Sequence, residues 1–386
     1  MRVLTFTSLF PNNIQQNLGG FIARRMSCWA ENHASQWLPI APVPYFPRLP
    51  FNSPWKKYSD VESVESFKQW EVQHLRYMMV PMIGLPFQGQ SMAACTLPKV
   101  KELIIQKGPF DLIDAHFIYP DAYAALKISK QLDLPLVVSG RGSDINLYSQ
   151  INSIRPKIIK VLKNADAVIG VSRDLIEKMI SLGVPESKCH HIPNGIDSCR
   201  FFPIENKNEK SPLTNMLAVG NLVPEKGFHI LLKAVSILKL EHPHIRLKIA
   251  GSGPQLNELS SMCSSLRIKE NVQFIGQIRH QDMPLVFQRA DILCLSSLRE
   301  GNPNVVLEAL ASGLPVAATP VGGVPELIHN NINGWLSPDL SSEGLAGAIS
   351  RVLTQKWSAE KIRNSVKNKT WDSVANKLQK VFKSVL

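Results

Sequence analysis

The chain has 386 residues, of which 44% are hydrophobic and 19% are charged. This length favours two domains, and this composition supports buried cores and excludes a disordered chain. The 43 basic and 31 acidic residues give a net charge of +12 without a run of five like charges, and we expect the excess to be spread through both halves. We therefore expect no nucleic-acid partner. Diffuse basicity suits small anionic ligands or an anionic membrane surface.

The cysteines and the apolar segments bear on location. The six cysteines contain no CxxC pair, which favours reduced thiols and a cytosolic protein. Cys189, His190, His191 and Cys199 lie near one another in the sequence, but their spacing fits no common zinc site. No apolar run approaches the ~18 residues that a spanning helix needs. The apolar N-terminus is too short for a signal peptide, so we expect it to be the first strand.

The first half of the chain alternates short apolar runs with helical patterns. Strands are expected at residues 3–7, 38–42, 75–80, 112–116, 134–139 and 165–172, and helices at 21–32 and 122–132. Residues 44–72 begin rich in proline and aromatic residues, and we expect an amphipathic helix after them. The alternation predicts a parallel sheet wound on both faces.

The second half repeats this architecture after a polar segment, residues 197–215, that fits a linker. Strands are expected at residues 216–221, 245–251, 272–276, 291–297 and 315–319, with a turn at 333–338 and an amphipathic helix at the end. The predicted fold class is therefore α/β with two doubly wound domains, residues 1–196 and 197–370. Such sheets bind ligands beyond the carboxyl ends of their strands.

Two glutamates flank the loop after the strand at residues 291–297. Glu300 precedes a Gly-Asn-Pro-Asn loop, and Glu308 is expected two turns into the helix that follows. Unpaired N–H groups at a helix start bind phosphate, so this arrangement can hold a nucleoside diphosphate sugar. The diphosphate would lie at the helix start, and each carboxylate would accept hydrogen bonds from hydroxyl groups. The alternative is a solvated pair of glutamates beside an ordinary turn.

The stretch from residue 299 to 328 resembles the donor-site signature of glycosyltransferase family 4, which has the GT-B fold. The matching residues are Glu300, Gly301, Glu308, Ala309, Ala311, Gly313, Pro315, Val316, Gly322, Gly323 and Glu326. The resemblance implies two Rossmann-like domains that face a cleft, with a last helix, about residues 371–386, packed back on the first domain. It also implies that Glu308 binds the ribose hydroxyls and Glu300 the donor sugar or the adjacent phosphate.

Other loops of the second domain would complete the donor site. The resemblance gives Lys226, in a Pro-Glu-Lys-Gly segment, the role of a diphosphate-binding cation. Asn221 departs from the family, which commonly has an arginine there, so either another cation such as Arg279 or Arg299 compensates or donor affinity is modest. Further donor contacts are expected from the helix start, from a strand–Gly turn and from a base-binding segment: Gly301, Asn304, Val305, Gly251, Gly253 and Ile278.

The first domain contributes three segments. Gly19 and Gly20 open a helix and would let backbone N–H groups approach phosphate or acceptor; an ordinary turn is the alternative. His116 ends a strand where family members place a histidine that touches the donor sugar and the reaction centre. An Arg-Gly-Ser-Asp segment supplies Arg141 for an acceptor phosphate, and Ser143 and Asp144 beside it for acceptor hydroxyls.

The resemblance implies a retaining sugar transfer in which His116, Glu300 and Lys226 are catalytic. We expect no cofactor and no metal, because the DxD metal motif of the other transferase fold is absent. The same resemblance implies a lipid-linked saccharide acceptor and cell-surface polysaccharide synthesis. The alternatives are an epimerase or hydrolase of the same architecture, or a nucleotide-sugar-binding scaffold subunit that has lost activity.

We expect a cytoplasmic enzyme that works at the inner face of the cytoplasmic membrane. The segment at residues 44–58 combines aromatic side chains with lysines, which suits the headgroup level of a membrane. These residues are Tyr45, Phe46, Phe51, Trp55, Lys56 and Lys57. The alternative is that the segment caps the first domain.

Overall fold

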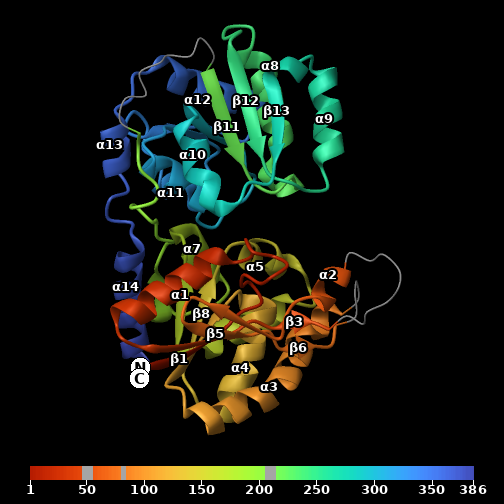
Figure 1. The fold of residues 1–386 in the computed structure, drawn as a ribbon, viewed down its shortest axis with the longest axis vertical. Coiled ribbons are helices and arrows are strands. Elements are labelled where there is room, and N and C mark those ends of the chain that lie inside the picture. The colour runs from red at the N-terminus through yellow and green to blue at the C-terminus, as the bar shows by residue number, and fades with distance from the viewer. Residues whose placement is uncertain (46–54, 80–83, 205–213) are drawn as a thin grey trace. The chain divides into compact units, whose positions relative to one another are not determined.

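The computed structural model describes residues 1–45, 55–79, 84–204 and 214–386. It divides into two compact units (Figure 1). Unit 1 comprises Met1–Asn194 and Trp371–Leu386, and unit 2 comprises Gly195–Thr370. The boundary after Asn194 lies two residues before the one placed from the sequence. Phe46 and Phe51 lie outside the described residues.

Unit 1 is built on a mostly parallel sheet with the order β10-β9-β8-β7-β1-β2-β5-β4. In that order the strands are β10 (Cys189–His191), β9 (Ala167–Gly170), β8 (Leu136–Gly140), β7 (Leu112–His116), β1 (Arg2–Phe6), β2 (Gln36–Ile40), β5 (Trp70–Gln73) and β4 (Val64–Phe67). A separate parallel pair joins β3 (Val43–Pro44) to β6 (Arg76–Tyr77). The strand expected at residues 75–80 is therefore short and lies outside the main sheet.

Helices cover both faces of this sheet because successive buried residues of each strand point to opposite sides. Leu4 and Phe6 of β1 pack with α3, α4, α6 and α7, whereas Val3 packs with α1 and α14. The helices of unit 1 are α1 (Gly20–Asn32), α2 (Lys56–Ser59), α3 (Gln88–Lys107), α4 (Tyr123–Leu132), α5 (Ser143–Asn146), α6 (Arg155–Asn164), α7 (Arg173–Ser181) and α14 (Trp371–Ser384). The single turns of unit 1 are η1 (Leu85–Phe87), η2 (Ile118–Ala122), η3 (Tyr148–Gln150) and η4 (Glu186–Lys188).

The end of the 44–72 segment is a hairpin and not the amphipathic helix that we expected. Strands β4 and β5 pair antiparallel, with Lys68 in a left-handed conformation at the turn. Phe67 and Trp70 pack against Trp37 of β2 in tilted, edge-on contacts with ring centroids 6.4 and 5.1 Å apart. The packing of these two aromatic side chains against the edge of the sheet stabilises the hairpin more than the weak helical pattern of the segment would stabilise a helix.

The C-terminal helix α14 packs on α1 within unit 1 (Figure 1). The Trp29 ring meets Phe382 edge-on at 5.1 Å, and its indole Nε1 donates to Oε1 of Gln379 at 2.7 Å. At the other end of the contact, Nδ2 of Asn32 donates to Asp372 at 2.7 Å. The last sixteen residues therefore complete the core of the unit that the N-terminus begins.

Unit 2 is built on a parallel sheet with the order β13-β12-β11-β14-β15-β16. These strands are β13 (Val272–Gly276), β12 (Ile245–Ala250), β11 (Thr214–Val219), β14 (Ile292–Leu295), β15 (Val316–Ala318) and β16 (Gly334–Leu336). Residues 333–338, expected as a turn, contain β16, because Gly334 lets the chain lie close to Val316 and pair with β15.

Helices again cover both faces, and alternate strand residues separate the two cores. Met216 packs with α8, α9 and α12, whereas Leu217 packs with α10, α11 and α13. Phe201 joins the second of these cores, so the start of the polar segment expected as a linker belongs to unit 2. These helices are α8 (Phe228–Leu238), α9 (Leu256–Ser265), α10 (Met283–Gln288), α11 (Asn304–Ala311), α12 (Ser342–Thr354) and α13 (Ala359–Asn364). The single turns of unit 2 are η5 (Pro224–Lys226), η6 (Lys269–Asn271), η7 (His280–Asp282) and η8 (Val324–Glu326).

Candidate functional site

The loops after β11 and β14 bring two of the expected donor-site residues together. The Nζ atom of Lys226 lies 2.6 Å from Oε1 of Glu300, and the Ser297 hydroxyl donates to the same oxygen at 2.6 Å. The Lys226 side chain is 30% exposed and that of Glu300 is 9% exposed. Within the described residues Oε2 of Glu300 accepts no hydrogen bond, so this half-buried pair keeps donors and acceptors for a ligand.

Backbone contacts fix the relative position of these two loops. The Ser296 hydroxyl donates to the carbonyl of Lys226 at 3.0 Å, and the N–H of Leu298 donates to the carbonyl of Glu225 at 2.8 Å. Gly227 has φ 59° and starts α8; a Cβ there would lie 2.1 Å from the Ser296 carbonyl. Glycine is required because its left-handed backbone must touch the neighbouring loop.

Glu308 lies about one turn into α11, not two, because the helix begins only at Asn304. Its Oε1 lies 2.9 Å from Nε2 of His280, a residue that the sequence analysis did not select. The His280 ring packs edge-on against Phe201 at 5.8 Å, and its carbonyl accepts from Arg200 at 2.6 Å. The signal available in the sequence was a polar residue two positions after Ile278, in the loop that follows β13.

The start of α11 lies between the two glutamates in the chain. Gly301 is buried, Asn304 and Val305 are half-buried, and the N–H of Gly323 donates to the Gly301 carbonyl at 3.0 Å. A Cβ on Gly322 would lie 2.0 Å from the carbonyl of Glu300. The glycines of the matched stretch therefore hold the second loop against the carboxylate-bearing one.

The remaining donor-site candidates of unit 2 are spread over neighbouring loops. A Cβ on Gly251 would lie 1.9 Å from the Gly220 carbonyl, and one on Gly253 would lie 2.4 Å from that of Leu222. Loop packing therefore accounts for these two glycines, and a ligand contact by either stays a prediction. Ile278 is half-buried against the core beside α11.

Of the two arginines expected to compensate for Asn221, neither makes a hydrogen bond or an ion pair with Glu300 or Glu308 within the described residues. Asn221 itself is exposed, as is Arg299. Arg279 is exposed and pairs with Asp282 at 2.8 Å. The cation that lies against a candidate carboxylate is Lys226.

In unit 1 the ends of β7 and β8 carry a buried polar chain. Nε2 of His116 lies 2.9 Å from Oδ2 of Asp114, and Nδ1 lies 2.5 Å from Nη2 of Arg141. A guanidinium can only donate, so Nδ1 accepts and the ring proton sits on Nε2, facing Asp114. His116 is 0% exposed. One ring nitrogen lies against Arg141 and the other against Asp114, so a contact between His116 and a sugar stays a prediction.

Burial and neighbouring charges set the protonation states of the residues in this buried polar cluster. Burial lowers the pKa of His116 to about 4 despite the opposing charge of Asp114, so the ring is neutral. Burial raises the pKa of Asp114, but His116, Arg25 and Arg141 more than offset this and hold it below its usual value. Arg25 is buried on α1, and its guanidinium has no hydrogen-bond partner among the described residues. Asp114 and Arg25, which sequence reasoning missed, therefore belong to the same cluster.

The Arg-Gly-Ser-Asp segment separates into exposed and buried parts. Asp144 is fully buried and accepts from the N–H groups of Ile118, Arg141 and Gly142 at 2.9, 3.0 and 2.8 Å. Its oxygens serve backbone donors and hold the loops, so a contact between Asp144 and an acceptor hydroxyl stays a prediction. Ser143 is exposed and keeps surface for a ligand. Arg141 is half-buried, its guanidinium lies 3.2 Å from Asn194 and 2.5 Å from His116, and its Nε is buried, so its contact with an acceptor phosphate stays a prediction.

A second buried carboxylate, Asp121, lies next to these loops and was also missed. It accepts from the N–H of Ser8 in the loop after β1. Burial raises its pKa to about 7, and the charge of Asp144 adds to this. Further along the same loop, a Cβ on Gly19 would lie 2.0 Å from the Leu9 carbonyl, whereas Gly20 faces open space. Of the two glycines, Gly20 is the one with room for a ligand.

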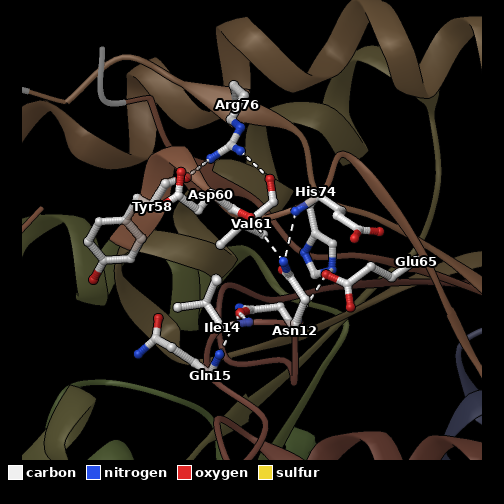
Figure 2. A network of polar contacts seen from close by, with 11 residues as sticks. Asn12, Ile14, Gln15, Tyr58, Asp60, Val61, Glu65, His74 and Arg76 are labelled. Atoms are coloured by element: carbon white, nitrogen blue, oxygen red, sulfur yellow. Dashed lines mark hydrogen bonds and ion pairs between the residues drawn. The ribbon is translucent and has the colours of Figure 1, made fainter. Parts of the chain in front are cut away.

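The loop after β1 is also tied to the 55–76 segment, as Figure 2 shows. The N–H of Asn13 donates to Glu65 at 3.1 Å, and its amide donates to the Asp60 carbonyl at 2.9 Å. Arg76 donates to the carbonyls of Tyr58 and Val61 in the same network. The described part of the insertion therefore supports a loop at the carboxyl edge of the unit 1 sheet.

The described residues contain neither a metal-binding cluster nor a membrane-spanning helix. No group of three or more histidine, cysteine, aspartate or glutamate side chains is placed to hold a metal ion there. No helix within the described ranges is both long and apolar enough to cross a membrane.

Two family models match adjacent parts of the chain. Residues 200–372 match Glycosyl transferases group 1, and residues 67–200 match Glycosyltransferase Family 4. A putative teichuronic acid biosynthesis glycosyltransferase of Bacillus subtilis is 29% identical over 373 residues, covering 93% of this chain and 91% of the relative. An uncharacterized glycosyltransferase of Methanocaldococcus jannaschii is 26% identical over 349 residues, covering 85% and 86%.

A solved structure agrees with the fold. Anabaena Alr3699/HepE in complex with UDP superposes with a TM-score of 0.72 at 19% identity, with both chains covered in full. Together with the two sheets, these findings make the chain a glycosyltransferase with the GT-B fold. The two matching family models support a transferase of the family 4 type. The expected fold class and enzyme class are thereby confirmed.

Proposed function

We propose that this glycosyltransferase moves a sugar from a nucleoside diphosphate sugar to a hydroxyl group of a lipid-linked saccharide, with retention of configuration. The observation that carries the donor part is the pair of glutamates on either side of the α11 start, one of them held by Lys226. The UDP complex of the Anabaena protein supports the choice of donor class. The teichuronic acid role in the name of the Bacillus relative supports cell-surface polysaccharide assembly.

Each donor-site residue has a part set by its position. The N–H groups at the start of α11 bind the diphosphate, as helix N-termini bind phosphate. Lys226 bridges Glu300 and a phosphate oxygen, since an ammonium has three donors. Glu308 accepts from the ribose hydroxyls, and Glu300 accepts from the donor sugar through Oε2.

The transfer proceeds as a same-face displacement. The bond between the anomeric carbon and the phosphate oxygen breaks, while a bond to the acceptor oxygen forms on the same face. The leaving phosphate oxygen takes the acceptor proton, so no separate base is required. Lys226 and the α11 start stabilise the growing phosphate charge, an effect worth about 3–4 kcal/mol per donor. No metal and no cofactor takes part in this proposal.

Unit 1 supplies the acceptor side. Arg141, oriented by His116 at 2.5 Å, binds an acceptor phosphate, and Ser143 hydrogen-bonds a hydroxyl group. Gly20 leaves room for the substrate beside the start of α1. The enzyme works in the cytoplasm at the inner face of the cytoplasmic membrane, where lipid-linked acceptors are found.

The test is a transfer assay with a panel of labelled nucleoside diphosphate sugars, with and without a membrane lipid extract. We expect label in the lipid fraction for one donor, an unchanged anomeric configuration by proton NMR, and full activity after EDTA treatment. Isomerised or hydrolysed donor without transfer would support the epimerase or hydrolase alternative. Donor binding without turnover on any acceptor would support a scaffold subunit.

A further inference from the structure

The net charge is shared equally by the two halves, +6 in residues 1–193 and +6 in residues 194–386, as we expected, but within the first half it is concentrated on three helices. Helices α3, α4 and α6, 40 residues in all, carry nine basic residues and one acidic residue, Glu102. Their net charge of +8 is two thirds of the total of +12. The basic residues are Lys99, Lys101, Lys107, Lys127, Lys130, Arg155, Lys157, Lys160 and Lys163.

These three helices are neighbours on one face of the unit 1 sheet, where α3 and α4 lie side by side (Figure 1). Within the described residues, the ion pairs of this face are Lys99 with Glu102 at 2.7 Å and Lys107 with Glu71 at 2.9 Å. No described carboxylate lies within 4.0 Å of the other seven cationic groups. The charge of this face is therefore largely uncompensated.

The outer side of α3 mixes polar residues, among them Gln90, Lys101 and Glu102, with a stripe of exposed apolar residues. Phe87, Ala94, Pro98 and Ile105 follow helical spacing along one stripe and are all exposed, Phe87 by 67% and Ile105 by 85%. Met92, Val100 and Leu103 on the other side of the helix are buried in the core. Exposed apolar side chains beside many basic residues are typical of helices that lie in a membrane interface.

A groove of about 590 Å³ runs between α3 and α4, next to this stripe. Ala93 and Leu97 from α3 and Leu126 from α4 line it, together with Lys127, Lys130 and Lys160. A lining that combines apolar and cationic residues fits an anionic amphiphile.

We propose that the α3–α4–α6 face binds an anionic lipid bilayer, with α3 lying in the plane of the interface. Phe87 and Ile105 enter the headgroup boundary, and the lysines of α4 and α6 lie over anionic headgroups. The exposed apolar stripe favours a bilayer over a soluble polyanion, which would use the charge alone. This inference extends the proposed function, because a lipid-linked acceptor requires a membrane, but its test does not depend on sugar transfer.

The 44–58 segment is a weaker candidate for this role. The segment carries a net charge of +3, from Arg48, Lys56 and Lys57, but residues 59–73 that follow it carry −3. Residues 44–73 are therefore neutral as a whole, against +8 for the α3–α4–α6 face. Because of this difference in net charge, we expect the membrane contact at the α3–α4–α6 face and not at the insertion.

The test is flotation of the full-length protein with phosphatidylglycerol-containing vesicles over a salt series. We expect binding by the wild type that weakens with salt and is absent with purely zwitterionic vesicles. The K127Q/K130Q/K160Q/K163Q variant should bind several hundred-fold more weakly, since each lysine near an anionic surface contributes about fivefold. Ile105→Ser should weaken binding by about tenfold at constant charge.

A matched control removes the same charge elsewhere. K233Q/K269Q/K356Q/K361Q changes four exposed lysines of unit 2 and should float like the wild type. K56Q/K57Q tests the insertion directly and should also float normally. Equal loss in either control, no loss in the α4–α6 variant, or no flotation of the wild type would overturn the proposal.

Two further results keep the outcomes separate. Stronger binding to a soluble polyanion than to vesicles, unaffected by Ile105→Ser, would replace the bilayer with a polyanionic partner. Normal flotation together with no transfer from any donor would leave the membrane face standing and remove the proposed function. Circular dichroism and the unfolding midpoint confirm that each variant is folded.

Discussion

The carboxyl ends of the two sheets use charged residues in different ways. In unit 2, two short contacts join partly exposed side chains from separate segments: Lys226 with Glu300 at 2.6 Å, and His280 with Glu308 of α11 at 2.9 Å. In unit 1, Asp114, His116, Asp121 and Asp144 are all fully buried. The charged groups at the edge of the unit 2 sheet are partly exposed, whereas those at the edge of the unit 1 sheet are enclosed by other protein groups.

This difference in exposure separates residues that can bind a ligand from residues that hold the loops in place. A partly exposed pair such as Lys226 and Glu300 can exchange partners with a ligand at little desolvation cost, because water already reaches both groups. A buried carboxylate such as Asp144, bonded to three backbone N–H groups, cannot leave them without leaving those donors unsatisfied. We therefore expect substitutions in unit 2 to change catalysis or binding, and substitutions of buried groups in unit 1 to change loop order and stability.

The largest effect is expected at Glu300. Glu300→Gln removes the charge that orients Lys226 and the acceptor for the donor sugar, and kcat/KM should fall by about 10²–10³-fold. Steady-state kinetics with the preferred donor measure this, with Glu360→Gln, an exposed glutamate of α13, as the control. Unchanged kinetics would place Glu300 with the scaffold residues.

Glu308 should affect binding more than turnover. Glu308→Ala removes the acceptor beside His280, and affinity for the free nucleoside diphosphate should fall about 10–100-fold, the scale of a hydrogen bond to a charged group. Isothermal titration calorimetry checks this directly. An equal affinity in the variant would contradict the ribose assignment.

His116 tests whether a buried residue of unit 1 reaches catalysis through Arg141. His116→Ala should lower kcat about tenfold and leave donor affinity unchanged, because Arg141 loses the partner that orients it at 2.5 Å. The double variant His116→Ala/Arg141→Ala should be no worse than Arg141→Ala alone, since the two act as a unit. Additive losses would show instead that His116 touches the substrate itself.

The sequence was most informative where residue type and strand end coincide. Alternating apolar runs predicted most strands of both sheets, and the spacing of Glu300 and Glu308 selected the loop that Lys226 meets. It was less informative where long-range packing decides. The β4–β5 hairpin depends on Trp37, 33 residues before Trp70, and no local pattern shows that partner.

The same limit applies to individual site residues. Nothing in the local sequence distinguishes His280 or Asp114. His280 matters because the distant Glu308 lies beside it, and Asp114 because the distant Arg25 lies near it. Asp144 looked like a ligand because Arg-Gly-Ser-Asp is a polar loop, but the sequence cannot show that its carboxylate turns inward to three N–H groups. Orientation of a polar side chain is set by the folded backbone and not by its neighbours in the chain.

Asp144 should matter for stability. Asp144→Asn replaces one acceptor oxygen by a donor that faces backbone N–H groups, and the free energy of unfolding should fall by about 2–3 kcal/mol. Urea unfolding followed by circular dichroism measures it, with Asp133→Asn, a residue at the C-cap of α4, as the control. An unchanged midpoint would mean that the loops after β7 and β8 do not depend on this carboxylate.

The smallest expected effect, and the sharpest in pH, concerns Asp121. Its pKa is raised from 3.8 to about 7, so between these values the folded protein holds a proton that the unfolded chain has released. Stability from this group therefore falls as the pH rises through that window. His116 acts in the opposite sense, because the folded ring loses its proton near pH 4 while the unfolded ring keeps it to about 6.5. The two contributions oppose each other in the wild type.

Asp121→Asn removes one side of this balance, because an amide does not titrate but still accepts from the N–H of Ser8. Relative to the wild type, the variant should gain about 1–2 kcal/mol of unfolding free energy between pH ~5 and ~6. Urea unfolding at a series of pH values measures the difference. If the two curves run parallel, Asp121 is ionised in the folded state, and buried charge in unit 1 is tolerated where we expect it to be neutralised.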